Sequence, residues 1–302
     1  MNAGLANNSD SYPKMESAPS PMRTILIPLD FSEASINAFK YGTSLAARNN
    51  CRVILLHVYK LDMAGGYSMP YLQKEVIQKT EEKVMNQFKE LLNELGEKEL
   101  KAINFNNIVC SGDTVEEIIR VSRVYHADHI IMGMRGENQM IRKILGGTSL
   151  SVINRTTKPV LLIPYHTSYE PIQHIAYATN FEEEDPRIID QLLKLAKPYS
   201  AKVSCVHIRE KDEKRDMFKQ EILMKAFEGD VSIENIDFLT LDYDNVVEGL
   251  NQFVKDREVD VLVMLTHKRS IFSRLFHKSQ TRQMAIDSQV PLWAFSLQVP
   301  NG

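Results

Sequence analysis

The chain has 302 residues, of which 43% are hydrophobic and 25% charged, so it is long enough for two globular domains. Its formal net charge is −3 at pH 7, and without a global basic field a dedicated nucleic-acid binder is disfavoured. No apolar run approaches the ~20 residues of a membrane span. Cys51, Cys110 and Cys205 are far apart and form no CxxC pair. They are interpreted as buried free thiols in a cytoplasmic protein, with no metal site.

Residues 1–22 differ in composition from the rest of the chain. They are rich in Ser, Asn and Pro and lack the apolar centre of a signal peptide. We expect a disordered tail that is not translocated.

From Arg23 onward, short apolar runs alternate with amphipathic segments. Strands are expected at 24–30, 52–60, 105–112, 128–133 and 158–164, and helices at 32–50, 71–98, 114–126 and 149–157. Ser32 is the expected cap of the first helix, and Asp113 or Thr114 of the third. Near-continuous apolar strands separated by helices predict an open α/β fold, with a five-stranded parallel sheet covered by helices on both faces.

The same order of elements then returns. Asn180 stands 150 residues after Asp30 in a matching context, and His207 stands 150 residues after His57. Such ordered matches indicate an internal duplication, with Met264 aligned to Gly133 at an offset of 131. The expected division is a tail at 1–22, a domain at 23–164, a linker at 165–173 and a second domain at 174–298. A repeated position explains the two histidines better than shared catalysis does.

Ligands of open parallel sheets bind beyond the carboxyl ends of the strands, where Asp30 and the glycine-rich stretch 130–149 are expected. Gly133 and Gly136 allow a ligand to approach the backbone closely. Gly146, Gly147, Thr148 and Ser149 open the next helix, whose free amides favour phosphate, and Arg135, Arg142 and Lys143 add positive charge. The alternative interpretation of this stretch is a flexible loop between strand and helix.

The spacing Gly133-x2-Gly136-x9-Gly146 resembles the ATP-binding motif of the universal stress protein family. The resemblance includes "ILIPLDFSEAS", "LLHVY" and "KPVLLIP", covers 23–164, and extends more weakly over 174–298. It implies a tandem member with two Rossmann-like domains of the adenine nucleotide alpha hydrolase type. In this family the domains often pair through their fifth-strand edges, here "VLLIP" and "PLWAFS".

The resemblance also implies the roles of individual residues. Asp30 would contact the adenosine, the Val58 backbone would hold the adenine edge, and the three spaced glycines would surround the ribose and phosphates of ATP or of its Mg²⁺ complex. The expected cofactor-binding residues are Pro28, Leu29, Asp30, Ser32, Val58, Gly133, Arg135, Gly136, Gly146, Gly147, Thr148 and Ser149. The family has Ser or Thr where this chain has Gly147, so Thr148 or Ser149 would supply the hydroxyl, or the backbone amides would suffice.

The second copy departs from the motif. Asn180 replaces the aspartate, and Met264, His267 and His277 take the glycine positions, so no second ATP site is expected. The basic segment 267–282 is interpreted as a solvated helix face, with an anion site or an acidic partner as the alternative.

The first functional hypothesis is a stress-response protein that binds ATP in its N-terminal domain and acts as a nucleotide-dependent sensor or regulator. No residue stands out as a general base, so at most slow hydrolysis is expected. The alternative is an interaction protein with a vestigial glycine loop, which recruits protein partners or further copies of itself. A nicotinamide-dependent oxidoreductase is disfavoured because no GxGxxG follows the first strand. Neither nucleic acid nor membrane is an expected partner.

Overall fold

The computed structural model describes residues 23–60, 70–134, 147–165, 167–182, 185–209, 221, 223, 225, 235–266 and 290–296. The predicted tail at 1–22 and the basic segment 267–282 lie outside this part of the chain. So do Arg135, Gly136 and Gly146.

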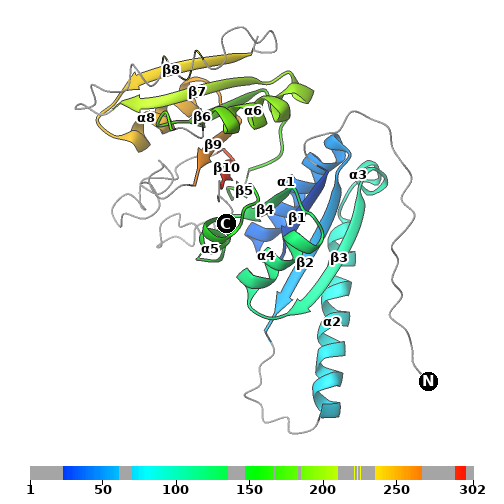
Figure 1. Ribbon diagram of the computed structural model, residues 1–302. Helices are drawn as coiled ribbons and strands as arrows, with labels where there is room; N and C mark the ends of the chain where they lie inside the picture. The colour runs from blue at the N-terminus through cyan, green and yellow to red at the C-terminus, as the bar shows by residue number, and fades with distance from the viewer. Residues whose placement is uncertain are drawn as a thin grey trace.

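The ten strands form one sheet in the order β3-β2-β1-β4-β5-β10-β9-β6-β7-β8 (Figure 1). Their bounds are β1 Thr24–Pro28, β2 Arg52–Tyr59, β3 Asn104–Ser111, β4 His129–Gly133, β5 Val160–Ile163, β6 His174–Ala178, β7 Lys202–Arg209, β8 Ile236–Asp242, β9 Val261–Leu265 and β10 Leu292–Phe295. Within each run of five strands every pairing is parallel. The predicted α/β class, with two five-stranded parallel units, is therefore correct.

The two units join in the middle of the sheet. β5 and β10 pair antiparallel, with Leu161 opposite Trp293 and Leu162 opposite Leu292. This is the predicted pairing of fifth-strand edges. It gives both edges a hydrogen-bonding partner within one chain, so neither is left open to pair with another molecule.

Helices cover both faces of the sheet. The bounds are α1 Glu33–Asn49, α2 Pro70–Asn93, α3 Glu97–Ala102, α4 Thr114–Val124, α5 Gly147–Arg155, α6 Asp185–Ala196, the 3₁₀ helix η2 Lys197–Tyr199 and α8 Val246–Asp256. One core lies between the sheet and α1, α2 and α6, and the other lies between the sheet and α4, α5 and α8. Alternation along β1 supplies both cores, since Ile25 and Ile27 enter the first and Leu26 the second.

The single helix predicted over 71–98 is wrong. The structure has α2, a break, and then α3, which has Gly96 as its N-cap in an extended conformation (φ −67°, ψ 154°). The apolar spacing that predicts one helix continues across the break, but glycine gains least from the helical conformation and allows the chain to turn there.

The structure also corrects the register of the internal repeat after the third strand. β4 ends at Gly133 and β9 ends at Leu265, and Ile25 pairs with His129 as Ile175 pairs with Val261. The residue that takes the place of Gly133 is therefore Leu265, at an offset of 132, and not Met264.

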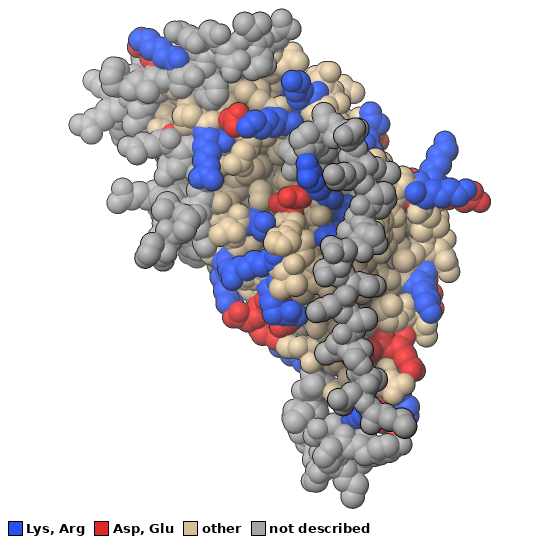
Figure 2. Space-filling view, turned by 45° about the vertical axis from the view of Figure 1, so that its right-hand side comes forward, with Lys and Arg blue, Asp and Glu red and all other residues tan. Residues whose placement is uncertain are grey.

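The described surface is mixed in charge. Basic and acidic side chains lie interspersed on the face in Figure 2, and exposed ion pairs include Lys40 with Glu94 at 3.3 Å and Lys194 with Asp190 at 2.7 Å. The three cysteines are free thiols; Cys51 and Cys205 are buried, whereas Cys110 is only half-buried. None of the described helices has the length and apolarity needed to cross a membrane.

Candidate functional site

A cavity of about 290 Å³ opens at the carboxyl ends of β1 and β4. These two strands are neighbours at the point where the strand order of the N-terminal unit reverses, because β2 lies on one side of β1 and β5 lies on the far side of β4. Helices on opposite faces of the sheet start at such a reversal, so they leave a crevice between them. The cavity therefore lies where an open α/β sheet most often binds a ligand.

Nine of the twelve predicted binding residues line this cavity. They are Pro28, Leu29, Asp30, Ser32, Val58, Gly133, Gly147, Thr148 and Ser149. They come from four separate places in the chain: the end of β1 with the turn after it, β2, the end of β4, and the start of α5. The other three, Arg135, Gly136 and Gly146, lie outside the described residues.

A strained turn between β1 and α1 positions Asp30. Phe31 has a positive φ of 60°, which is uncommon for a bulky residue and requires support from its surroundings. Its ring packs against the rings of His57 and Phe88, with distances between ring centroids of 5.1 Å and 5.6 Å. The His57 Nδ1 lies 2.7 Å from the Leu29 carbonyl oxygen; because a carbonyl only accepts, Nδ1 carries the proton and donates.

The C-terminal unit contains the same turn. Phe181 has a φ of 55° and packs on His207 at 4.6 Å, and the His207 Nδ1 lies 2.9 Å from the Thr179 carbonyl oxygen. The turn persists where Asn180 replaces the aspartate. The paired histidines therefore belong to the fold, as the sequence predicts.

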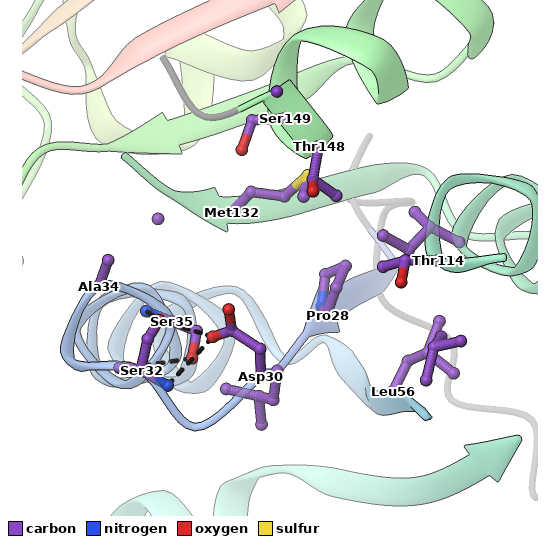
Figure 3. A pocket seen from close by; sticks show the side chains of 15 residues that line it. Pro28, Asp30, Ser32, Ala34, Ser35, Leu56, Thr114, Met132, Thr148 and Ser149 are labelled. Carbon is purple, nitrogen blue, oxygen red and sulfur yellow. Dashed lines mark hydrogen bonds between the residues drawn. The ribbon is translucent and has the colours of Figure 1, made fainter. Parts of the chain in front are cut away.

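The Asp30 carboxylate is held by the first residues of the next helix region. Its Oδ1 accepts hydrogen bonds from the Ser32 amide at 3.0 Å and from the Ser32 hydroxyl at 2.5 Å. The Ser32 Oγ in turn caps α1 by accepting from the Ser35 amide at 3.3 Å, as predicted. Figure 3 shows Asp30 pointing into the cavity from the side of α1.

These contacts determine the charge of Asp30. Burial acts to raise the pKa of the carboxyl group, but the hydrogen bonds from the Ser32 hydroxyl and amide outweigh it, and the pKa is lowered. Asp30 is therefore an anion at neutral pH. It can accept hydrogen bonds from hydroxyl or amino groups of a ligand, and it repels phosphate.

Gly133 allows α1 and β4 to lie against each other at the wall of the cavity. A Cβ atom at this position would lie 2.1 Å from the Ala34 carbonyl oxygen and 2.5 Å from its carbon. Real Cβ atoms do not come so close, so any side chain would push α1 outward. Ala34 lines the cavity, so this displacement would also change the shape of the site.

The start of α5 forms the opposite wall. Gly147 is the first residue of the helix, and a Cβ atom there would meet none of the described residues within 4 Å. Thr148 is exposed and Ser149 is buried, and both lie across the cavity from Asp30 (Figure 3). The first amides of a helix have no partners within it and carry partial positive charge, so this wall suits an anion.

Six lining residues are absent from the sequence-based prediction. They are Ala34, Ser35, Leu56, Thr114, Ile118 and Met132. Leu56 and Met132 lie near the ends of β2 and β4, and Thr114 comes after the end of β3 at the first turn of α4. The rule that ligands bind at carboxyl ends of strands predicts Thr114 when it is applied to the third strand as well as to the others.

Two positions of the equivalent surface are apolar in the C-terminal unit. Val246 takes the place of Thr114, since α8 begins there after the cap Asn245, as α4 begins after the cap Asp113. Leu265 takes the place of Gly133. Val246 and Leu265 are buried, at 7% and 4% exposed. The C-terminal unit thus has Asn180, Val246 and Leu265 where the N-terminal cavity has the carboxylate of Asp30, the hydroxyl of Thr114 and the glycine Gly133.

Two doubly wound units in tandem, with a polar cavity at the strand-order reversal of the N-terminal unit, define a Rossmann-like protein with a built-in pseudo-dimer. The chain belongs to the universal stress protein family, whose model matches residues 21–164 and again residues 171–296.

Some similar proteins match about half of this chain, and others match most of it. Universal stress protein MJ0577 of Methanocaldococcus jannaschii is 29% identical over an alignment of 157 residues, and the alignment covers 47% of this chain and 94% of the relative. Universal stress protein MJ0531 of the same organism is 24% identical over 168 residues, or 54% of this chain and 88% of the relative. The crystal structure of a universal stress protein from Archaeoglobus fulgidus shares the fold over 92% of this chain and 98% of its own, with a TM-score of 0.67 and 18% identity.

Proposed function

We propose that the N-terminal cavity binds an adenine nucleotide and that this nucleotide is ATP. The chain then acts as a nucleotide-dependent sensor or regulator in the stress response. The observation that carries this proposal is the pairing of a carboxylate and a helix start on opposite walls of one cavity at the carboxyl ends of β1 and β4. Family membership supports the class of protein.

The two walls suit different parts of a nucleotide. The phosphates go to the start of α5, where unpaired amides and the hydroxyls of Thr148 and Ser149 can donate to them. The described residues leave room beside Gly147 for a bulky anion. Mg²⁺ is proposed to be carried by the phosphates, since its ligands in such sites are largely phosphate oxygens and water.

Asp30 receives the sugar. An anion repels the phosphates, whereas a carboxylate is a strong acceptor for the hydroxyl groups of ribose. The Ser32 amide and hydroxyl donate hydrogen bonds to the Asp30 carboxylate and fix it before the ligand arrives. Little side-chain entropy is therefore lost on binding. The cavity volume of about 290 Å³ is near the lower end of the range for small-molecule sites.

One site per chain is proposed. In the C-terminal unit Asn180 stands in the place of Asp30, and Leu265, which has a side chain, stands in the place of Gly133. Binding rather than rapid turnover is proposed, because the side chain of Asp30 is engaged by Ser32 and lies on the wall opposite the phosphates. At most slow hydrolysis is expected.

Calorimetric titration of the full chain with Mg-ATP, ADP and AMP tests the proposal. We expect saturable binding at about one site per chain, weakened in Asp30→Ala. The matched variant Asp30→Asn keeps an oxygen acceptor for Ser32 and removes only the charge, so it separates the local fold from the ligand contact. If the folded wild-type chain shows no binding of any of the three nucleotides, the alternative of an interaction protein with a vestigial glycine loop replaces this proposal.

A further inference from the structure

The cavity has a third side, which neither the carboxylate nor the helix start of α5 occupies. Leu56, Val58 and Ile118 form it from β2 and α4, and Thr114 is the polar residue among them. Figure 3 shows Thr114 and Leu56 on the same side of the cavity, away from Asp30 and Ser32. This side is an apolar wall with one hydroxyl group.

The contacts of the described residues give the Thr114 hydroxyl no structural role. Asp113 caps α4, since its Oδ1 accepts from the Val115 amide at 3.1 Å and from the Glu116 amide at 3.0 Å. Among the described residues, the Thr114 side chain makes no hydrogen bond. It is half-buried at the cavity wall, and a polar group in such a place normally has a partner when the site is filled.

The internal repeat provides a natural comparison. The C-terminal unit keeps the cap at Asn245, which accepts from the Val247 amide at 2.8 Å, but the next residue is Val246. Valine has nearly the shape of threonine without the hydroxyl. The helix start therefore does not need the hydroxyl, and its presence coincides with the unit that has the polar cavity.

We propose that Thr114 determines base specificity and that its hydroxyl oxygen accepts a hydrogen bond from the exocyclic amino group of adenine. This inference rests on the proposed function. The phosphates occupy the wall of α5 and the ribose faces Asp30, so the base is left with the apolar wall of Leu56, Val58 and Ile118. The family resemblance puts the Val58 backbone at the adenine edge, but the apolar side chains of this wall barely distinguish one base from another. The exocyclic amino group has two hydrogens, so it can donate one to the Val58 carbonyl oxygen and the other to Thr114. A hydroxyl at this wall can distinguish them, because a ligand that lacks the matching group leaves it unpaired.

The test is a cycle of two ligands and three forms of the protein. Thr114→Val removes the hydroxyl and copies the residue of the C-terminal unit, and Thr114→Ser keeps the hydroxyl as a matched control. The ligands are ATP and purine riboside triphosphate, which lacks the amino group. Thermal unfolding of each variant verifies that it is folded.

We expect Thr114→Val to bind ATP about two- to tenfold more weakly than wild type, with Thr114→Ser close to wild type. The wild type should prefer ATP over purine riboside triphosphate by at least this factor, and the preference should be about two- to tenfold smaller in Thr114→Val.

Two results overturn the inference, and they differ from each other. If wild type and Thr114→Val bind ATP equally, or if the substitution weakens both ligands alike, Thr114 does not read the amino group and the proposed function stands. If the folded wild type binds neither ligand, the proposed function fails and this inference fails with it.

Discussion

Gly133 at the end of β4 and Ala34 in the first turn of α1 are in contact through their backbones, since a Cβ at Gly133 would lie 2.1 Å from the Ala34 carbonyl oxygen. This contact brings the helix start after Asp30 close to the end of β4. Leu265 at the equivalent position of the C-terminal unit excludes the same approach there, because its side chain is buried at that place.

Gly133→Ala is therefore expected to lower the free energy of unfolding by about 1–3 kcal/mol, because backbone atoms rather than a flexible side chain must move. Chemical denaturation measures the change. Gly147→Ala is the matched control, since an added methyl meets no described residue within 4 Å, and its effect should stay within about 1 kcal/mol of zero. Equal losses for the two variants would contradict the packing role of Gly133.

Gly147→Ser tests the departure of this chain from the family motif. The open space at this position accepts the side chain, and the new hydroxyl would lie at the start of α5 beside the proposed phosphate position. We expect ATP to bind more tightly by about two- to tenfold, with AMP affected less because it presents fewer phosphate oxygens. Titration calorimetry checks both, and unchanged ATP affinity would indicate that the α5 amides, Thr148 and Ser149 already suffice.

His129 predicts how stability depends on pH. It is buried on β4 against Trp293, with ring centroids 5.0 Å apart, and neither ring nitrogen has a hydrogen-bond partner among the described residues. Burial lowers the pKa of His129 to about 4, with Asp128 acting to raise it and Lys158 to lower it. Protonation is thus favoured in the unfolded chain, whose histidine titrates near pH 6.5.

Proton linkage gives the direction of the effect. The unfolded state binds the extra proton between pH 6.5 and about 4, so stability is complete above pH 6.5 and falls as pH drops through this window, by about 3 kcal/mol from this group. Denaturant unfolding of wild type and His129→Val at pH ~7.5 and ~5.0 measures the difference. Val261 occupies the equivalent position of β9, so valine suits the strand. Identical pH dependence in both proteins would argue against this origin.

Asn37 connects the segment after β5 to α1, the helix whose first turn lines the cavity. Its Nδ2 donates to the carbonyl oxygens of Pro164 at 3.0 Å and Thr167 at 3.4 Å. Asn37→Ala should lower the free energy of unfolding by about 1 kcal/mol and speed amide exchange at Thr167. Lys40→Ala on the same helix, which removes an exposed ion pair, is the control and should change exchange at Thr167 little. Protection that stays the same in Asn37→Ala would show that other contacts hold this segment.

The sequence alone determined the order of elements, the duplication and most of the described cavity. Alternating apolar strands and amphipathic helices permit few arrangements, and parallel strands bring their carboxyl ends to one edge. Asp30, Val58 and Gly133, far apart in the chain, were therefore predictable as neighbours. The joining of β5 and β10 followed from the family resemblance and from the need to pair open edges.

Only the tertiary structure decided the features that depend on distance across the fold. Leu265 rather than Met264 replaces Gly133, because strand pairing and not local similarity sets the register. Thr114 joins the site because α4 starts beside β2, a neighbour in the sheet but not in the sequence. The break before Gly96 and the positive φ of Phe31 likewise depend on packing, which local propensity does not encode.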